Sequence, residues 1–261
     1  MKIIVCIKQV PDTTEVKLDP KTGRLIRDGV PSIINPDDKN ALEEALRIKD
    51  ENPDTTVTVV SMCPPQADVA MREALAMGAD EAILISGREF GGSDTWATSY
   101  IIATAIKKIP DYDIIFCGRQ AIDGDTAQVG PQIAEQLNIP QITYVQKLDI
   151  EGDKVIVQRQ LEDGYTVVEA KMPVLLTAIK ELNTPRYMTP KGIFEAYNKT
   201  VQVWGFNDVP VDAEKIGLKG SPTNVNRTFS PEAKGKGIML EGADKETVKT
   251  LIAKLDEKHL L

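Results

Sequence analysis

The sequence predicts an α/β fold with a doubly wound, mostly parallel sheet, added antiparallel strands and a C-terminal arm. Through the first 140 residues, short β-branched segments alternate with segments of helical periodicity, which is typical of successive βαβ units. After about residue 140, strand-like segments follow one another without helices, so we expect antiparallel strands within the same sheet or beside it. Proline and glycine then punctuate a weakly apolar stretch that ends in one amphipathic segment.

The first half of the chain supplies the predicted βαβ units. Lys2–Val10 is predicted to be a buried strand, and the segments that flank Asp19–Gly23 are predicted to pair as a hairpin. A helix follows Asn35, a candidate N-cap, and Pro36, which suits a first helical turn. Further strands are predicted at Thr55–Met62, Glu81–Ser86 and Asp113–Cys117, and further helices at Gln66–Met77, Asp94–Ile109 and Thr126–Leu137.

The second half is predicted to extend the sheet and then leave it. We divide the chain into an α/β domain (residues 1–182), an extended arm with short elements only (183–242) and a C-terminal helix (243–261). The helix carries Val248, Leu251 and Ile252 on one face, so arm and helix are expected to pack on the sheet or on a partner, with an unpartnered flexible tail as the alternative. The four strands expected before the arm are Ile142–Leu148, Lys154–Gln160, Val167–Ala170 and Val174–Ala178.

Composition argues against several classes of function. Acidic residues outnumber basic ones by 39 to 31, and no segment concentrates Lys and Arg, which argues against a nucleic-acid-binding surface. The longest apolar stretches are far shorter than the roughly 20 residues of a membrane helix, and the first residues resemble a strand more than a signal peptide. Three cysteines without a CxxC pair exclude a disulfide framework and a thiolate zinc site, and they fit a cytoplasmic location. The single histidine, His259, argues against most histidine-based catalysis.

Candidate ligand-binding segments lie where predicted strands end. Open parallel sheets bind ligands at the carboxyl ends of their strands, and four segments are expected there: Cys6–Pro11, Asn35–Asp38, Met62–Pro65 and Gly118–Gly130. The last segment is long and polar, and it leads into a predicted helix whose first N–H groups, around Thr126–Val129, would face an anion. An ordinary capped loop is the alternative, and neither GxGxxG nor GxxxxGK[ST] occurs.

Individual side chains of this loop suggest separate roles. Arg119 can supply positive charge, while Thr126 and Gln128 can donate hydrogen bonds to phosphate oxygens. Asp125 is a candidate cap of the helix, and Asp123 a candidate partner of a ribose hydroxyl or of a backbone turn.

Other chemistry-bearing side chains have simpler interpretations. The cysteines at predicted strand ends are interpreted as buried small apolar residues: Cys6, Cys63 and Cys117. Asp37 and Asp38 fit the preference of a helix N-terminus for negative charge, and Glu43 and Glu44 are interpreted as a solvated face.

Several motifs, in this order, resemble the β subunit of electron-transfer flavoproteins over nearly the whole chain. They are Ile4–Asp12, Asn35–Pro36 before a helix with the sequence Leu-Glu-Glu-Ala-Leu, Ala74–Asp80, Gly118–Asp123, Val157–Gly164, Met172–Thr177 and Asn183–Tyr187. The resemblance implies an adenine-nucleotide-binding, Rossmann-like fold and a heterodimer with a larger α subunit that holds a redox FAD. The arm and the C-terminal helix would then pack on that α subunit.

The resemblance also implies a nucleotide in this subunit. In the respiratory branch of the family it is AMP with a structural role. In the electron-bifurcating branch it is FAD, which takes hydride from NADH and passes electrons to ferredoxin or flavodoxin and, through the α-subunit FAD, to an acyl-CoA dehydrogenase.

The segment Asp123–Pro131 resembles the bifurcating branch, because Gly124, Thr126 and Ala127 would leave room for a pyrophosphate. We therefore expect FAD here. The first alternative is AMP in a subunit that acts as scaffold and dehydrogenase-docking platform, and the second is a free-standing nucleotide sensor of the stress-protein type, which the long arm disfavours.

Carried over position by position, the resemblance implies nucleotide contacts from the same strand-end segments. They are Cys6, Asn35, Pro36, Asp37, Asp38, Met62, Gly118, Arg119, Gln120, Ala121, Ile122, Asp123, Gly124, Asp125, Thr126, Ala127, Gln128 and Val129. It implies no metal ion and no catalytic side chain, since the flavin itself carries out hydride transfer.

Two positions depart from the family pattern. Thr166 stands where the family usually has Glu or Gln near the α-subunit flavin. Pro190 stands where the dehydrogenase-docking loop often has leucine, so Ile193 or Phe194 is the expected apolar anchor.

Overall fold

The computed structural model describes residues 1–12, 31–226 and 235–261. They fall into two compact units, Met1–Val225 and Asn226–Leu261. The hairpin predicted around Asp19–Gly23 lies outside the described residues.

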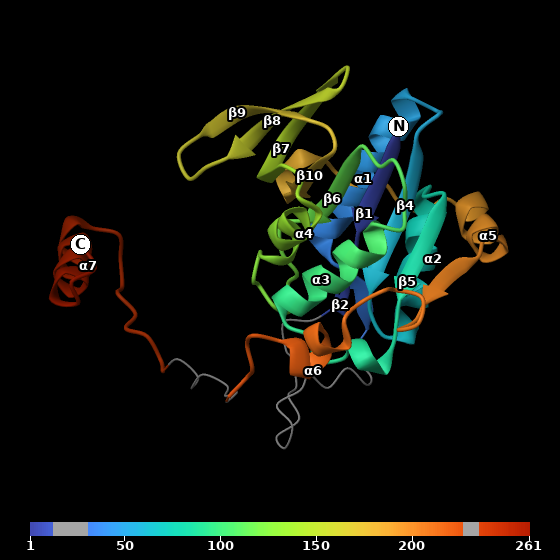
Figure 1. The fold of residues 1–261 in the computed structure, drawn as a ribbon. Coiled ribbons are helices and arrows are strands. Elements are labelled where there is room, and N and C mark those ends of the chain that lie inside the picture. Colours follow the sequence, from blue (N-terminus) through green and yellow to red (C-terminus); the bar gives the residue numbers. More distant parts are fainter. Residues whose placement is uncertain (13–30, 227–234) are drawn as a thin grey trace. The chain divides into compact units, whose positions relative to one another are not determined.

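The described part of the first unit is built on one large sheet (Figure 1). Its strands are β1 (Lys2–Cys6), β4 (Thr56–Met62), β5 (Glu81–Ile85), β6 (Ile114–Gly118), β7 (Gln141–Glu151), β8 (Lys154–Gln160), β9 (Tyr165–Lys171), β10 (Val174–Ala178) and β11 (Val201–Trp204). They lie in the order β11-β5-β4-β1-β6-β10-β7-β8-β9, parallel from β11 to β7 and antiparallel through β8 and β9. Two short strands, β2 (Gln9–Pro11) and β3 (Ser32–Ile34), pair separately.

Helices cover both faces of the parallel strands, which makes the sheet doubly wound (Figure 1). Side chains alternate along β1, so that Ile3 and Val5 belong to one buried cluster and Ile4 to the other. The helices α1 (Pro36–Glu51) and α2 (Asp68–Met77) belong to the first cluster, and α3 (Thr95–Ile106) and α4 (Val129–Leu137) to the second. The α/β, mostly parallel architecture predicted from the sequence is therefore confirmed.

The direction of the chain across the sheet reverses between β1 and β6. The chain passes from β1 through α1 to β4 on one side, whereas β5 leads through α3 to β6 on the other side. Open α/β sheets bind ligands outside the carboxyl ends of their strands at such a switch point. The fold therefore directs attention to Cys6 and Gly118, which end β1 and β6.

Three predictions about individual elements are wrong. The strand predicted at Lys2–Val10 is two strands, because the chain turns after Cys6. Val174–Ala178, predicted within an antiparallel set, is a fully buried parallel strand between β6 and β7. The helix predicted from Thr126 begins only at Val129, since positive φ angles in the preceding loop are incompatible with a right-handed helix.

Residues 183–225 contain more regular structure than the predicted arm. They include α5 (Pro190–Asn198), the short helix α6 (Gly217–Gly220) and β11, which pairs in parallel with β5 at the edge of the sheet. By its internal contacts this stretch belongs to the first unit.

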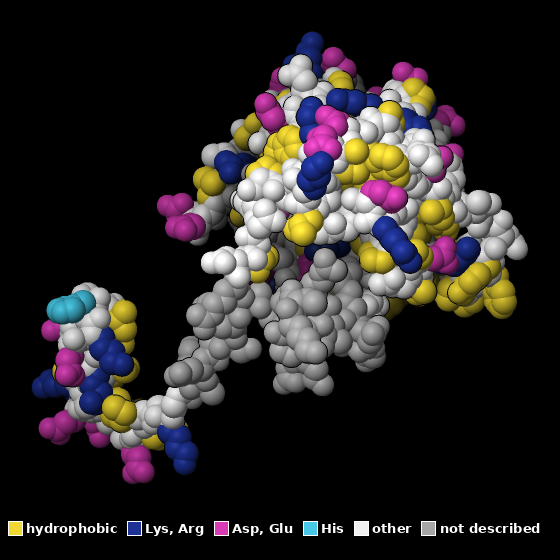
Figure 2. All heavy atoms as spheres, turned by 60° about the horizontal axis from the view of Figure 1, so that its bottom comes forward, with side chains coloured by type: hydrophobic (Ala, Val, Ile, Leu, Met, Phe, Trp, Pro, Cys, Tyr) yellow, Lys and Arg dark blue, Asp and Glu magenta, His cyan; other side chains and the backbone are white. Residues whose placement is uncertain are grey.

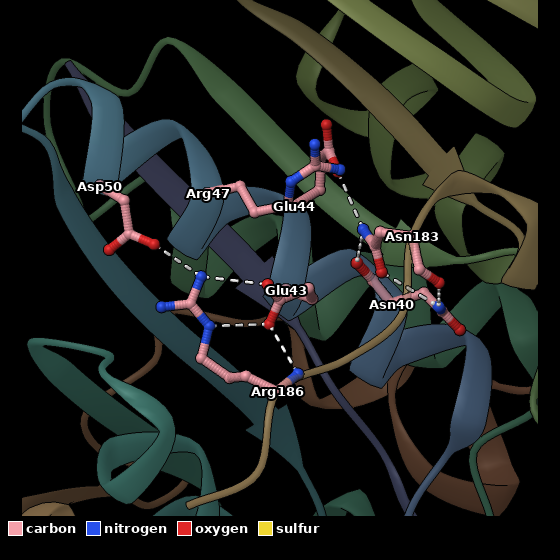
Figure 3. Close-up of polar contacts among 7 residues, drawn as sticks. All are labelled: Asn40, Glu43, Glu44, Arg47, Asp50, Asn183 and Arg186. Atoms are coloured by element: carbon pink, nitrogen blue, oxygen red, sulfur yellow. Dashed lines mark hydrogen bonds and ion pairs between the residues drawn. The ribbon is translucent and has the colours of Figure 1, made fainter. Parts of the chain in front are cut away.

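A partly buried polar cluster joins the beginning of this stretch to α1 (Figure 3). The Arg186 guanidinium donates hydrogen bonds of 2.8 and 3.0 Å to the Glu43 carboxylate and one of 2.7 Å to Asp50. The Asn183 amide donates to Glu44 at 2.8 Å. Glu43 and Glu44 are only 5% and 7% exposed, so their interpretation as a solvated face is wrong.

The second unit is described by one helix, α7 (Lys245–Glu257), within the predicted C-terminal segment. The Asp244 carboxylate accepts hydrogen bonds from the first main-chain N–H groups of α7 and so caps it. Val248, Leu251 and Ile252 are each about half exposed, and Figure 2 shows hydrophobic side chains along one side of this helix. In the described part of the chain, no helix is both long and apolar enough to span a bilayer.

Candidate functional site

The switch point brings together segments that are distant in the sequence. Cys6 and Cys117 lie opposite each other on β1 and β6, and α1 begins at Pro36 beside the end of β6. Cys6 and Met62 both pack against the second buried cluster.

Asp38 lies at the centre of this arrangement. One carboxylate oxygen accepts a hydrogen bond of 2.7 Å from the main-chain N–H of Lys8, after β1, and the other accepts one of 3.0 Å from Gly118, at the end of β6. The side chain is nearly buried, at 7% exposure. Burial raises the pKa of Asp38 to about 7, although hydrogen bonds from Asn35, Lys8 and Gly118 oppose this effect.

Asn35 occupies the predicted N-cap position of α1, but its side chain does not cap the helix. Its amide donates to the Gln120 carbonyl at 2.8 Å, and its side-chain oxygen accepts from the Ile122 N–H at 3.0 Å. This fully buried side chain therefore holds the first half of the loop that follows β6.

Lys8 makes a third attachment to the same half of the loop. Its ammonium group lies 2.6 Å from the Asp123 carboxylate, which is 10% exposed. Asp123, a candidate ribose partner, is thus engaged in an ion pair. The sequence placed Lys8 in a strand-end segment but indicated no role for it. The one signal for such a role was a positive charge shortly after the end of β1.

Arg119 lies against protein groups at the start of the loop. Its Nε is 3.3 Å from the Asp37 carboxylate, and its guanidinium is 5.9 Å from the centre of the Tyr144 ring. Burial raises the pKa of Asp37, while the Arg119 charge opposes that rise. Tyr144 adopts a positive φ of 58° at an irregularity between β7 and β10, a conformation that is rare for an aromatic residue.

The second half of the loop has a different character. Asp125 and Ala127 have positive φ angles of 48° and 52°, and Gln128 then adopts a right-handed helical conformation. Among the described residues, the main-chain N–H groups of Thr126, Ala127 and Gln128 donate no hydrogen bond. Asp125 does not cap α4, because its carboxylate accepts from the Gln120 amide at 2.9 Å and the N-cap position belongs to Gln128.

Consecutive N–H groups with alternating left- and right-handed backbone form a concave site that suits an anion. A Cβ added to Gly124 would meet no atom within 4 Å, so the loop is open at this point. Gln128 also accepts a hydrogen bond of 3.0 Å from the Thr95 hydroxyl of α3. The site therefore fits a phosphate group next to free space, with Val129 at the start of the helix that follows.

The thiols of this region are suited to packing and not to chemistry. Cys63 and Cys117 are buried at 8% and 6% exposure, and Cys6 is partly buried. A hydrogen bond with Cys6, together with burial, raises the pKa of the Cys117 thiol well above its usual value. Cys117 therefore stays neutral, as its interpretation as a small apolar residue requires.

The residues expected to dock a dehydrogenase lie elsewhere, on α5, which packs against α2 (Figure 1). Pro190 is the first residue of α5, and Ile193 and Phe194 are 40% and 77% exposed. The Arg72 side chain donates to the Ala196 carbonyl at 3.0 Å and holds α5 in place. Thr166 lies in β9 opposite Arg159.

Comparison with known proteins yields one consistent family. Residues 22–209 match the model of the electron transfer flavoprotein domain. The chain is 62% identical over the full length of both proteins to "Electron transfer flavoprotein subunit beta" of Thermoanaerobacterium thermosaccharolyticum. It is 58% identical to "Caffeyl-CoA reductase-Etf complex subunit CarD" of Acetobacterium woodii and 53% identical to "Acryloyl-CoA reductase electron transfer subunit gamma" of Anaerotignum propionicum, again over the full length of each.

Proposed function

The chain belongs to the electron transfer flavoprotein family as a β subunit, and we propose that it binds FAD at the switch point and uses this flavin to oxidise NADH. The observation that carries the proposal is the run of N–H groups at Thr126–Gln128, which donate no hydrogen bond within the described structure. They lie beside the open space at Gly124. A pyrophosphate would accept from these groups, and the rest of a dinucleotide would extend into the open space.

The side chains of the site bind and orient and do not take part in the chemistry. When bound, the flavin supplies hydride acceptance and single-electron transfer. The loop supplies N–H donors, and the attachments made by Asn35, Asp38 and Lys8 hold the half of the loop that precedes those donors. A chain with one histidine, His259, which lies beyond the end of α7, is suited to this division of roles.

We further propose that the electrons leave by two routes. One leads to ferredoxin or flavodoxin, and the other leads through an FAD of the α subunit to an acyl-CoA dehydrogenase. The names of two relatives support the second route, because each includes a reductase of a CoA thioester. The exposed side chains of Ile193 and Phe194 on α5 provide an apolar contact surface for such an enzyme.

Titration of the nucleotide-depleted αβ complex with FAD, followed by NADH, tests the proposal. We expect FAD to bind at the β site and NADH to bleach its absorbance. Thr126→Ala should weaken FAD binding several-fold, because it removes a hydroxyl donor beside the main-chain N–H groups. Thr104→Ala is the matched control, since this hydroxyl bonds only within α3. Exclusive binding of AMP at the β site would refute the proposal and support the scaffold alternative.

A further inference from the structure

Asp38 joins the two strands on either side of the switch point. Its carboxylate accepts from the N–H of Lys8 beyond β1 and from the N–H of Gly118 at the end of β6, and it is nearly buried. We propose that Asp38 is a positioning residue of the nucleotide site, whose ionised carboxylate holds the Gly118–Asp123 half of the loop in its binding conformation without touching the ligand. The inference rests on the proposed function for the identity of the ligand.

The contact between Asp38 and Gly118 is unusually close. A Cβ at Gly118 would lie 2.2 Å from the Asp38 carboxylate oxygen and 2.6 Å from the Asp38 nitrogen. Only glycine leaves room for α1 to approach the strand end in this way. The carboxylate thus occupies the gap at the switch point, and both of its oxygens are engaged with the protein.

The other attachments of the loop depend on the same position. Asp38 fixes the main chain of Lys8, and the Lys8 ammonium group holds Asp123. Asn35, three residues before Asp38, holds the Gln120 carbonyl and the Ile122 N–H. Displacement of Asp38 would therefore loosen the links that Asn35 and Lys8 make to the first half of the loop.

Ionisation decides whether Asp38 can hold both strands. A carboxylate accepts from two N–H groups, whereas a protonated carboxyl directs its own O–H at one of them. The titratable groups that face it are Asp37 on α1 and Cys117 on β6, and the Lys8 ammonium group lies at Asp123. Burial raises the pKa of Asp38 to about 7, so its charge changes in the neutral range.

FAD affinity measured against pH tests the proposal in the αβ complex. If binding requires the ionised form, wild-type affinity should fall about tenfold from pH 8 to pH 6, as one linked proton demands. Asp38→Asn should bind FAD weakly and with little pH dependence, because its side-chain amide has one acceptor oxygen and one NH2 donor. Glu44→Gln is the matched control, because Glu44 is a buried carboxyl of the same helix with a raised pKa but bonds to Asn183.

Hydrogen exchange in the nucleotide-free complex provides a readout that needs no ligand. Corrected for intrinsic rates, protection of the Gly118 and Ile122 amides should fall between pH 8 and pH 6 in the wild type and be low throughout in Asp38→Asn. Protection independent of pH, or Asp38→Asn with wild-type affinity and pH profile, would overturn the proposal. Absence of FAD binding by a wild type that shows the exchange change would refute the proposed function alone.

Discussion

Replacement of Gly118 by alanine tests the steric basis of the site. The added Cβ would lie 2.2 Å from the Asp38 carboxylate oxygen, 2.6 Å from the Asp38 nitrogen and 2.7 Å from the Asp37 carbonyl carbon. Two of these atoms belong to the main chain of α1, so rotation of a side chain cannot relieve the clash. Separations near 3.0 Å would require α1 or β6 to move by several tenths of an ångström.

The expected cost combines overpacking with a lost hydrogen bond. Overpacking of a core costs about 1–3 kcal/mol, and loss of a hydrogen bond to a charged acceptor costs about 1.5–3 kcal/mol. We therefore expect Gly118→Ala to lower the free energy of unfolding by about 2.5–6 kcal/mol, or roughly 5–20 °C in Tm. The loop would move with β6, so the nucleotide content of the complex should fall as well.

Gly124→Ala is the matched control, because a Cβ there would meet nothing within 4 Å. Thermal unfolding of the nucleotide-free αβ complex should be close to wild type for this variant, within about 0.5 kcal/mol. Wild-type Tm and nucleotide content in Gly118→Ala would show that α1 does not press against the end of β6, and the steric reasoning would fail.

Three further predictions concern α1 and α5. Arg186→Met should leave the Glu43 carboxylate buried without its partner and destabilise the β subunit by about 3 kcal/mol in urea unfolding; a change below 1 kcal/mol would contradict this. Phe194→Ala should raise the KM for the acyl-CoA dehydrogenase several-fold while NADH still bleaches the flavin, and Leu218→Ala, which removes another exposed apolar side chain away from α5, should not. The folded-state pKa of Asp38 lies above the unfolded value of 3.8, so the protonated carboxyl favours the folded state. The free energy of unfolding should therefore decrease by up to about 4 kcal/mol as pH rises from about 4 to 7. Unfolding of Asp38→Asn measured across that range should lack this decrease.

The sequence predicted the elements of the fold better than their connections. Local periodicity was sufficient to place α1 and the parallel strands β4, β5, β6 and β10. The edge strand β11 was not predicted, because it lies within the stretch interpreted as an arm. The direction of Val174–Ala178 was not predicted, because a continuously buried strand shows no alternation that distinguishes parallel from antiparallel pairing. The late start of α4 was missed because positive φ at Asp125 and Ala127, neither of them glycine, leaves no mark in the sequence.

The candidate site was predicted as a region and not as a set of contacts. Strand ends and the resemblance both indicated the switch point, and the structure brings Asn35, Asp38 and Gly118 together there. The role of the Asn35 side chain depends on a loop some 85 residues away in the sequence. Glu43 resembled a solvated residue for the same reason, since Arg186, its partner, lies 143 positions later.

Nucleotide content of the purified αβ complex tests the central claim most directly. The complex would be co-expressed, purified and denatured, and its released nucleotides separated and quantified by absorbance. We predict two FAD per heterodimer, one of which is lost selectively in Gly118→Ala. One FAD and one AMP per heterodimer would contradict the claim, because the open loop at Gly124–Gln128 would then hold a monophosphate and this subunit would carry no flavin.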